Sequence, residues 1–334
     1  GRVNPFQMNS SQKIEIIVGF STHRIEVLPF AKNFMERADI IILEEPPNEN
    51  FRLVLEGKIS EEDYVLNEEF WFPEFEKQTL KLLKNFHQQG KKIFQIEPYL
   101  EGVKILQQRA EGIVSHQSID EVLLERIAET EKNAIGKLLR FYEVSLTGDF
   151  EKIVDSVKDF SKADAERFRL RDQLRVEAIL KVLLSLKQGL KKVYVEAGTI
   201  HLYFKKLLQL NTLSLGKVSQ FFLLQKVLKS LVGKPYVFPP GELLTLRYIF
   251  NRKENPKTEN LLAARSLVYI KIIPKEEFLP HEENPFPHFK EELRAIKLVE
   301  RLDFEDCKRL YSKLFWIKDY KEARKLVEDH LKSR

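Results

Sequence analysis

The clearest hydrophobic pattern lies in the first 45 residues, where two short apolar runs flank a segment with helical spacing. Residues 13–19 are rich in β-branched side chains and end in glycine, which is typical of a buried strand. Apolar residues recur at helical spacing from Ile25 to Met35, and residues 40–43 form a second apolar run that a double proline ends. Strand, helix and strand over about 30 residues predict a βαβ unit with parallel strands.

The same alternation continues downstream. Residues 70–88 have the pattern of a helix, and residues 91–96 have that of a third strand. A long helix-rich stretch follows, before a fourth strand at 192–197 and a helix at 202–210. The fold class that this order predicts is α/β, with a mainly parallel sheet flanked by helices and a helix-rich C-terminal region.

After residue 215 the pattern is less regular. Residues 220–232 and much of 289–331 have helical spacing, whereas 267–273 fit either a fifth strand or the end of a helix. Three prolines between 280 and 287 indicate a linker. The expected division is a tail over 1–12, whose first residues precede Met8 and fit an added segment, an α/β core over 13–215, and a helix-rich region over 216–334.

Composition narrows the class of protein. Of 334 residues 43% are hydrophobic, which is enough for a packed core and excludes a wholly disordered chain. A lone cysteine, Cys307, excludes a disulfide scaffold and a cysteine-rich zinc module. A net charge of +5 is no signature of nucleic-acid binding, and no apolar run is long enough to span a membrane. We expect a cytoplasmic protein without a nucleic-acid partner, and the sequence leaves its oligomeric state open.

Polar residues stand where each predicted strand ends. They are His23, Glu44 with its neighbour Glu45, Glu97 and His201. Ligands of open parallel sheets bind outside these strand ends. Two imidazoles and a carboxylate are suitable ligands for a divalent metal such as Mn, Co or Zn. The alternative is that each residue is an ordinary loop or helix-capping residue.

Four segments together are similar to the TraB/Tiki family, which is joined to the erythromycin-esterase-like and ChaN-like superfamily. They are 17–23, 40–44, 170–174 and 193–201, and the resemblance covers about residues 13–210. It rests on a histidine after the first strand, a glutamate after the second, an Arg-Asp pair in a helix, and a Gly-x-x-His motif after the fourth strand. The chain departs from the family at Phe20, where the first motif has glycine, so that Phe20 can narrow or abolish the site.

The resemblance implies a metal-dependent hydrolase that acts on peptide or ester bonds of a peptide or small-molecule substrate. His23, Glu44 and His201 would hold the metal, and Glu44, Arg171 and His201 would be catalytic. Metal-bound hydroxide would attack the substrate, and Glu44 would accept a proton because Glu45 raises its pKa. Arg171 would stabilise the negative charge that builds up on the substrate.

Other functions remain open. Arg171 can equally belong to a charged helix face with Asp172 and Arg175. The protein can also be a non-catalytic regulatory protein that binds a metal, haem or a small ligand on the same fold. A third possibility is an interaction protein whose partner surface lies in residues 216–334. The sequence contains no P-loop, dinucleotide-binding, His-Glu-x-x-His or Gly-x-Ser-x-Gly motif, which argues against those enzyme classes.

Overall fold

The computed structural model describes residues 14–114, 119–186, 191–212 and 216–334. The chain forms two compact units, which we describe separately. The first comprises Gly1–Ile127 and Arg169–Tyr236, and the second comprises Ala128–Phe168 and Val237–Arg334. Two long helices, α6 (Glu121–Thr147) and α7 (Phe150–Leu184), each contribute a part to both units.

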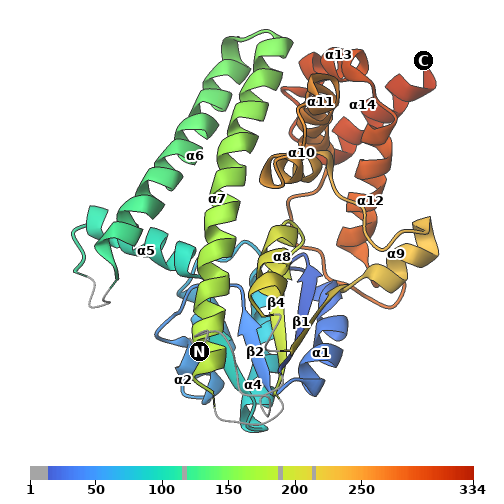
Figure 1. Ribbon diagram of the computed structural model, residues 1–334. Coiled ribbons are helices and arrows are strands. Elements are labelled where there is room, and N and C mark those ends of the chain that lie inside the picture. The colour runs from blue at the N-terminus through green and yellow to red at the C-terminus, as the bar shows by residue number, and fades with distance from the viewer. Residues whose placement is uncertain (1–13, 115–118, 187–190, 213–215) are drawn as a thin grey trace. The chain divides into compact units, whose positions relative to one another are not determined.

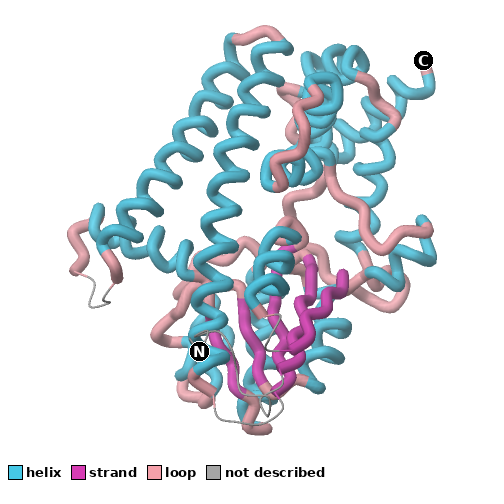
Figure 2. Tube along the Cα trace, in the orientation of Figure 1, coloured by secondary structure: helices cyan, strands magenta, loops and turns pink. Residues whose placement is uncertain are grey.

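The described residues of the first unit contain a five-stranded parallel sheet with the strand order β3-β2-β4-β1-β5 (Figures 1 and 2). The strands are β1 (Ile14–Ser21), β2 (Ile40–Leu43), β3 (Lys92–Gln95), β4 (Lys191–Gly198) and β5 (Gly216–Phe222). The four strands that the sequence predicts are therefore neighbours, and the α/β class is confirmed.

Helices cover both faces of this sheet. They are a short 3-10 turn (Ile25–Val27), α1 (Leu28–Arg37), α2 (Phe51–Leu55), α3 (Glu61–Leu66), α4 (Pro73–Gln88), α5 (Pro98–Ala110), α8 (Leu202–Asn211) and α9 (Gln225–Val232), with parts of α6 and α7. On one face Val195 packs in a core cluster with Ile179 of α7 and Phe204 of α8. On the other face the Tyr194 ring stacks on Phe34 of α1. Burial on both faces explains why β2 is apolar throughout rather than alternating.

The fifth strand corrects the expectation of a helix over 220–232. β5 occupies Gly216–Phe222, and only Gln225–Val232 is helical. β5 lies at the sheet edge and is only partly buried. Its polar residues interrupt the apolar run from which the sequence would predict a strand. Gly216 is required there, because a Cβ atom would lie 1.8 Å from the Ile14 carbonyl oxygen. The first unit thus extends past the expected boundary at 215, and residues 128–168 belong to the second unit.

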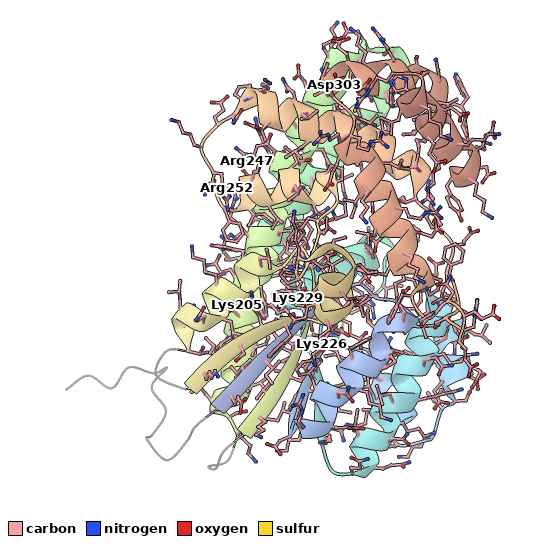
Figure 3. The ribbon with its side chains drawn as sticks, turned by 90° about the vertical axis from the view of Figure 1, so that its right-hand side faces the viewer. Lys205, Lys226, Lys229, Arg247, Arg252 and Asp303 are labelled. Carbon is pink, nitrogen blue, oxygen red and sulfur yellow. The ribbon has the colours of Figure 1, made fainter. Side chains whose placement is uncertain are left out.

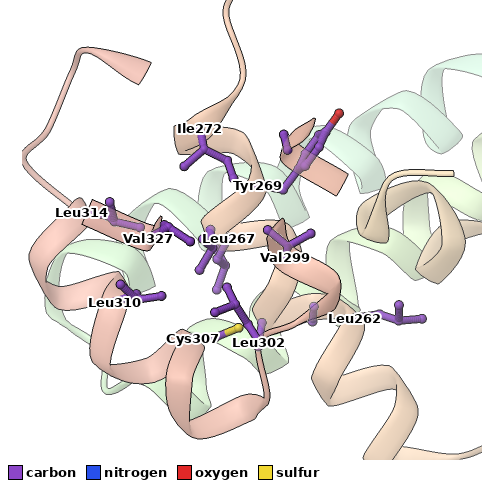
Figure 4. Close-up of a cluster of buried hydrophobic side chains, with 14 of the residues drawn as sticks. Leu262, Leu267, Tyr269, Ile272, Val299, Leu302, Cys307, Leu310, Leu314 and Val327 are labelled. Carbon is purple, nitrogen blue, oxygen red and sulfur yellow. The ribbon is translucent and has the colours of Figure 1, made fainter. Parts of the chain in front are cut away.

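The second unit is helical in its described residues. Besides parts of α6 and α7 it contains α10 (Pro240–Ile249), α11 (Pro256–Ile272), α12 (Pro287–Glu300), α13 (Phe304–Leu314) and α14 (Tyr320–Lys332). α11 contacts all four of the other C-terminal helices, and residues such as Leu267, Val299 and Cys307 form the core around it (Figure 4). Residues 267–272 are thus the end of a helix, which settles the alternative that the sequence left open.

A capping box begins α13. The Asp303 carboxylate, labelled in Figure 3, accepts a hydrogen bond from the Asp306 amide, and Asp306 accepts one from the Asp303 amide. This reciprocal pairing satisfies two of the amides that a helix start leaves free. None of the described helices is long and apolar enough to cross a membrane.

Candidate functional site

The carboxyl ends of three neighbouring strands bring charged residues together in the first unit. Glu44 follows β2, Glu97 follows β3 at the start of α5, and His201 follows β4 at the start of α8. Arg171 and Asp172 of α7 meet them there. The parallel sheet explains this convergence, because the carboxyl ends of its strands lie at one edge.

We call Glu44, Glu97, Arg171, Asp172 and His201 the strand-end cluster. His201 lies at its centre. Its Nε2 atom lies 2.6 Å from Glu44 Oε1, and its Nδ1 atom lies 2.6 Å from Asp172 Oδ1. Burial alone would lower the pKa of His201, but the two carboxylates outweigh burial and raise this pKa to about 10. His201 is therefore an imidazolium at neutral pH, and both of its ring nitrogens donate hydrogen bonds.

Both carboxylate oxygens of Glu44 also have partners. Its Oε2 atom accepts a hydrogen bond from the Gly198 amide at 2.7 Å, and Arg171 Nη2 lies 3.6 Å from its Oε1 atom. Burial raises the pKa of a carboxyl, but the charge of His201, its hydrogen bond and two arginines hold the pKa of Glu44 well below its usual range. The expectation that Glu45 raises the pKa of Glu44 is therefore wrong, because the nearby cations outweigh the neighbouring carboxyl group.

Arg171 joins the third strand end to the cluster. Its Nη2 atom donates to Glu97 Oε2 at 3.2 Å. The pKa of Arg171 is raised, because Glu97, Glu44 and Asp172 outweigh the effect of burial. Two buried carboxylate oxygens, Glu97 Oε1 and Asp172 Oδ2, have no hydrogen-bond partner among the described residues.

Glu45 differs sharply from its neighbour. Its Oε1 atom accepts a hydrogen bond from Gln95 Nε2 at 2.9 Å. Burial and the negative charge of Glu196 raise the pKa of Glu45 to about 7, although Gln95 and the charge of His23 partly oppose them. Glu196 is itself held in place, because its Oε1 atom accepts a hydrogen bond from the Glu44 amide at 3.1 Å. A carboxyl group with a pKa near neutrality can both accept and donate a proton.

His23 makes different contacts from those of His201. Its ring stacks on Phe75 with the ring centroids 5.5 Å apart, and its charge acts on Glu45. Within the described part of the chain no hydrogen bond or ion pair joins His23 to the other predicted site residues. The structure thus brings Glu44, Arg171 and His201 together and leaves His23 on the Glu45 side.

Phe20, at which the chain departs from the TraB/Tiki pattern, faces the core. It is buried, and its ring lies 5.3 Å from that of Phe222, centroid to centroid. The preceding residue, Gly19, is the one that has little room for a side chain, since a Cβ atom there would lie 2.4 Å from the Tyr194 hydroxyl oxygen. Phe20 therefore packs inside the unit instead of narrowing the strand-end cluster.

In the structure the cluster is a set of ion pairs and hydrogen bonds. Both nitrogens of His201 contact carboxylate oxygens, so a metal ion at His201 would have to replace one of these contacts. The oxygens of Glu44 are shared among His201, Arg171 and a backbone amide. Over the described ranges, no group of three or more His, Cys, Asp or Glu residues is arranged to hold a metal ion.

Asp172 and Glu196 were not among the predicted catalytic or metal-binding residues. Asp172 was visible only as a neighbour of Arg171 on a charged helix, and its contact with His201 joins residues 29 positions apart. Glu196 lies within β4, at a position that alternates with the buried residues. In both cases the signal is a charged residue that is buried or half-buried, and its partner can be identified only once the fold is known.

Comparisons with known proteins give one informative relative. An uncharacterized protein of Archaeoglobus fulgidus is 32% identical to this chain over 299 residues, which are 90% of this chain and 98% of the archaeal protein. The chain belongs to the same family as that protein. No family model matches the chain, and no solved structure matches it.

Proposed function

We propose that the protein is a TraB/Tiki-like hydrolase that cleaves an ester or amide bond of a small molecule or peptide, with Glu45 and Glu196 transferring the protons. The observation that carries the proposal is the placement of these two carboxyl groups. Glu45 follows β2 and Glu196 lies near the end of the neighbouring β4, and each is held by a hydrogen bond through one oxygen, so that its second oxygen can face substrate or water. The family resemblance supports the reaction class.

The chemistry needs one base and one acid. Glu196, as a carboxylate, accepts a proton from water while that water attacks the carbonyl carbon. Glu45, in its protonated form, donates its proton to the leaving oxygen or nitrogen as the bond to carbon breaks. The products are a carboxylic acid and an alcohol or amine, and transfer of the proton from Glu196 to Glu45 restores the starting state. The pKa of about 7 for Glu45 supports this role, because both of its forms are populated near neutral pH.

The strand-end cluster then has a positioning role. Glu44 connects it to the reacting pair, because its side chain is fixed by His201 while its amide holds Glu196. Glu45 follows directly in the chain. A shift of His201 or Glu44 would therefore move both proton-transferring groups.

The test is hydrolysis of a panel of activated esters and short peptides, assayed in EDTA and again with Mn, Co or Zn. We expect turnover in EDTA, and a loss of about 100-fold or more in Glu45→Gln, which is the usual contribution of a general acid or base. The matched control is Glu49→Gln, an exposed glutamate on the same loop. Turnover that survives Glu45→Gln, or that requires the added metal, would contradict the proposal.

A second candidate is a ligand-binding protein without turnover. The buried, unpaired oxygens of Glu97 and Asp172 favour it, since such atoms in a native interior call for a water or ligand partner. In this case members of the panel raise the melting temperature, no product forms, and Glu97→Gln removes the shift while Glu49→Gln keeps it.

A further inference from the structure

α6 has an apolar face on each side. One face is buried, and includes Ala134 and the core-packed Phe141 and Val144. On its solvent side four large apolar residues are exposed: Ile135 (47%), Leu139 (56%), Tyr142 (52%) and Leu146 (71%). Their spacing of four, three and four residues is that of a coiled-coil seam.

The neighbouring helix of the same unit has no such face. The exposed positions of α7 within the second unit are all charged: Glu151, Lys152, Asp155, Asp159, Lys162 and Glu166. An apolar seam on one helix of a pair, with a charged face on the other, is not the scatter of single apolar residues that ordinary surfaces show. The seam of α6 (residues 135–146) therefore has the character of a contact surface.

Gly136 supports close approach by another helix. It is in the interior of α6, where glycine costs about 1 kcal/mol relative to alanine. A Cβ atom at this position would meet nothing within 4 Å, so packing inside the chain does not explain the glycine. A glycine beside an apolar seam lets the backbone of a partner come near.

The charges at the ends of the seam select the partner and its direction. Lys132 lies on α6, three residues before Ile135. Asp149 lies in the turn after α6, three residues after Leu146, where its carboxylate also accepts a hydrogen bond from the Lys152 amide at the start of α7. Both residues are exposed. Two copies of the seam aligned in parallel would place like charges together at both ends. Two antiparallel copies would place each lysine beside an aspartate, which is favourable.

We propose that α6 is the dimer interface of this protein and pairs antiparallel with α6 of a second copy of the chain. In this register Ile135 packs against the partner's Leu146, and Leu139 packs against the partner's Tyr142. Gly136 lies opposite the partner's Ser145, so that two small residues meet beside the seam. All four apolar residues then leave water in one contact related by a two-fold axis.

The sharpest test is disulfide cross-linking of the full chain. Ile135→Cys and Leu146→Cys combined in one chain should give a covalent dimer on mild oxidation, because each cysteine faces the other type across the interface. Either single variant should not, since two copies of the same position lie about 16 Å apart along antiparallel helices. The wild-type chain, whose single cysteine Cys307 is buried, measures the background of cross-linking. Cross-linking by Ile135→Cys alone would overturn the antiparallel register.

The second test measures mass in solution over a concentration series. We expect twice the 39.4 kDa of one chain for the wild type, and at least a tenfold weaker dimer for Leu139→Glu. The control is Val122→Glu, an equally exposed apolar residue of α6 outside the seam. Lys132→Asp should weaken the dimer, because two antiparallel copies would then place an aspartate beside each Asp149. A wild-type monomer at every concentration, or a dimer insensitive to Leu139→Glu, would overturn the proposal.

Discussion

Each unit of this protein contains a histidine bonded to a carboxylate, but the two clusters differ in what surrounds them. In the second unit His330 Nε2 lies 2.8 Å from Asp306 Oδ1, and Arg334 donates to the other oxygen of Asp306. The side chains of His330 and Arg334 are more exposed than that of His201, and Asp306 is needed in any case for the capping box of α13.

The strand-end cluster contains more charge than its folding role requires. His201 is held between two buried carboxylates, and a third, Glu97, reaches it through Arg171. Two oxygens of these acids are left unpaired among the described residues. A helix cap explains the acid at α13, whereas no local backbone requirement explains Asp172 or Glu97. Both clusters contain the same types of residue. The strand-end cluster is distinguished as a candidate functional site by its deeper burial and by acidic residues that the backbone does not need.

The largest expected difference is between the two histidines. His201→Ala leaves Glu44 and Asp172 buried without their shared cation, and should lower the free energy of unfolding by about 3–5 kcal/mol at pH 7. His330→Ala removes one of several partners of Asp306, which keeps Arg334 and the Asp303 amide, and should cost about 1 kcal/mol. Urea unfolding followed at neutral pH measures both.

The sign of the pH effect sharpens this first prediction. His201 has a pKa of about 10 in the folded chain and a lower one when unfolded, so its contribution is complete in acid and is lost as the pH rises through about 10. The gap between wild type and His201→Ala should narrow over that range. Equal costs for the two histidines would show that the clusters are equivalent and break the comparison.

An intermediate effect of opposite direction is expected at Glu45. Its pKa of about 7 lies above that of an unfolded glutamate, so the folded state favours the protonated form of Glu45. Above pH 7 the carboxylate form destabilises the folded state. Glu45→Gln should therefore raise the free energy of unfolding by about 1–3 kcal/mol at pH 8 and by little at pH 4. Thermal melting at the two pH values tests this. Glu44→Gln is the contrast and should destabilise at pH 8, and a Glu45→Gln variant less stable than wild type at pH 8 would refute the assignment.

Much of the fold was predictable because the inner strands contain short runs of buried apolar residues. Residues 40–43 show this clearly, since every one of them is buried. β5 was not predictable, because it is an edge strand whose polar residues face solvent. The boundary between the units was also hidden, since α6 and α7 continue through it as regular helices. The hydrophobic pattern of a helix shows which of its residues are buried. It does not show whether those residues pack in the first unit or in the second.

The site was predictable to the extent that strand ends determine it. Glu44 and His201 follow strands directly, and the sheet order brings them together. The division of labour between Glu44 and Glu45 could not be derived from the sequence. The two carboxyl groups are adjacent in the chain, but one meets His201 while the other meets Gln95. That difference depends on contacts with residues 50 and more positions away.

The smallest expected effect is at Arg334. Its side chain is 45% exposed, its Nη1 atom lies 2.6 Å from Asp306 Oδ2, and it also donates to the Arg301 carbonyl. Water and salt screen such a pair, so Arg334→Ala should change the free energy of unfolding by about 1 kcal/mol or less, and by less still in high salt. Arg171→Ala is the matched variant, and its larger cost should persist in salt because Arg171 serves two buried carboxylates. Urea unfolding of both variants at low and high salt decides the matter. If the Arg334 variant has the larger and more salt-resistant loss, the cluster at α13 is the more strongly coupled of the two, and burial is not what separates them.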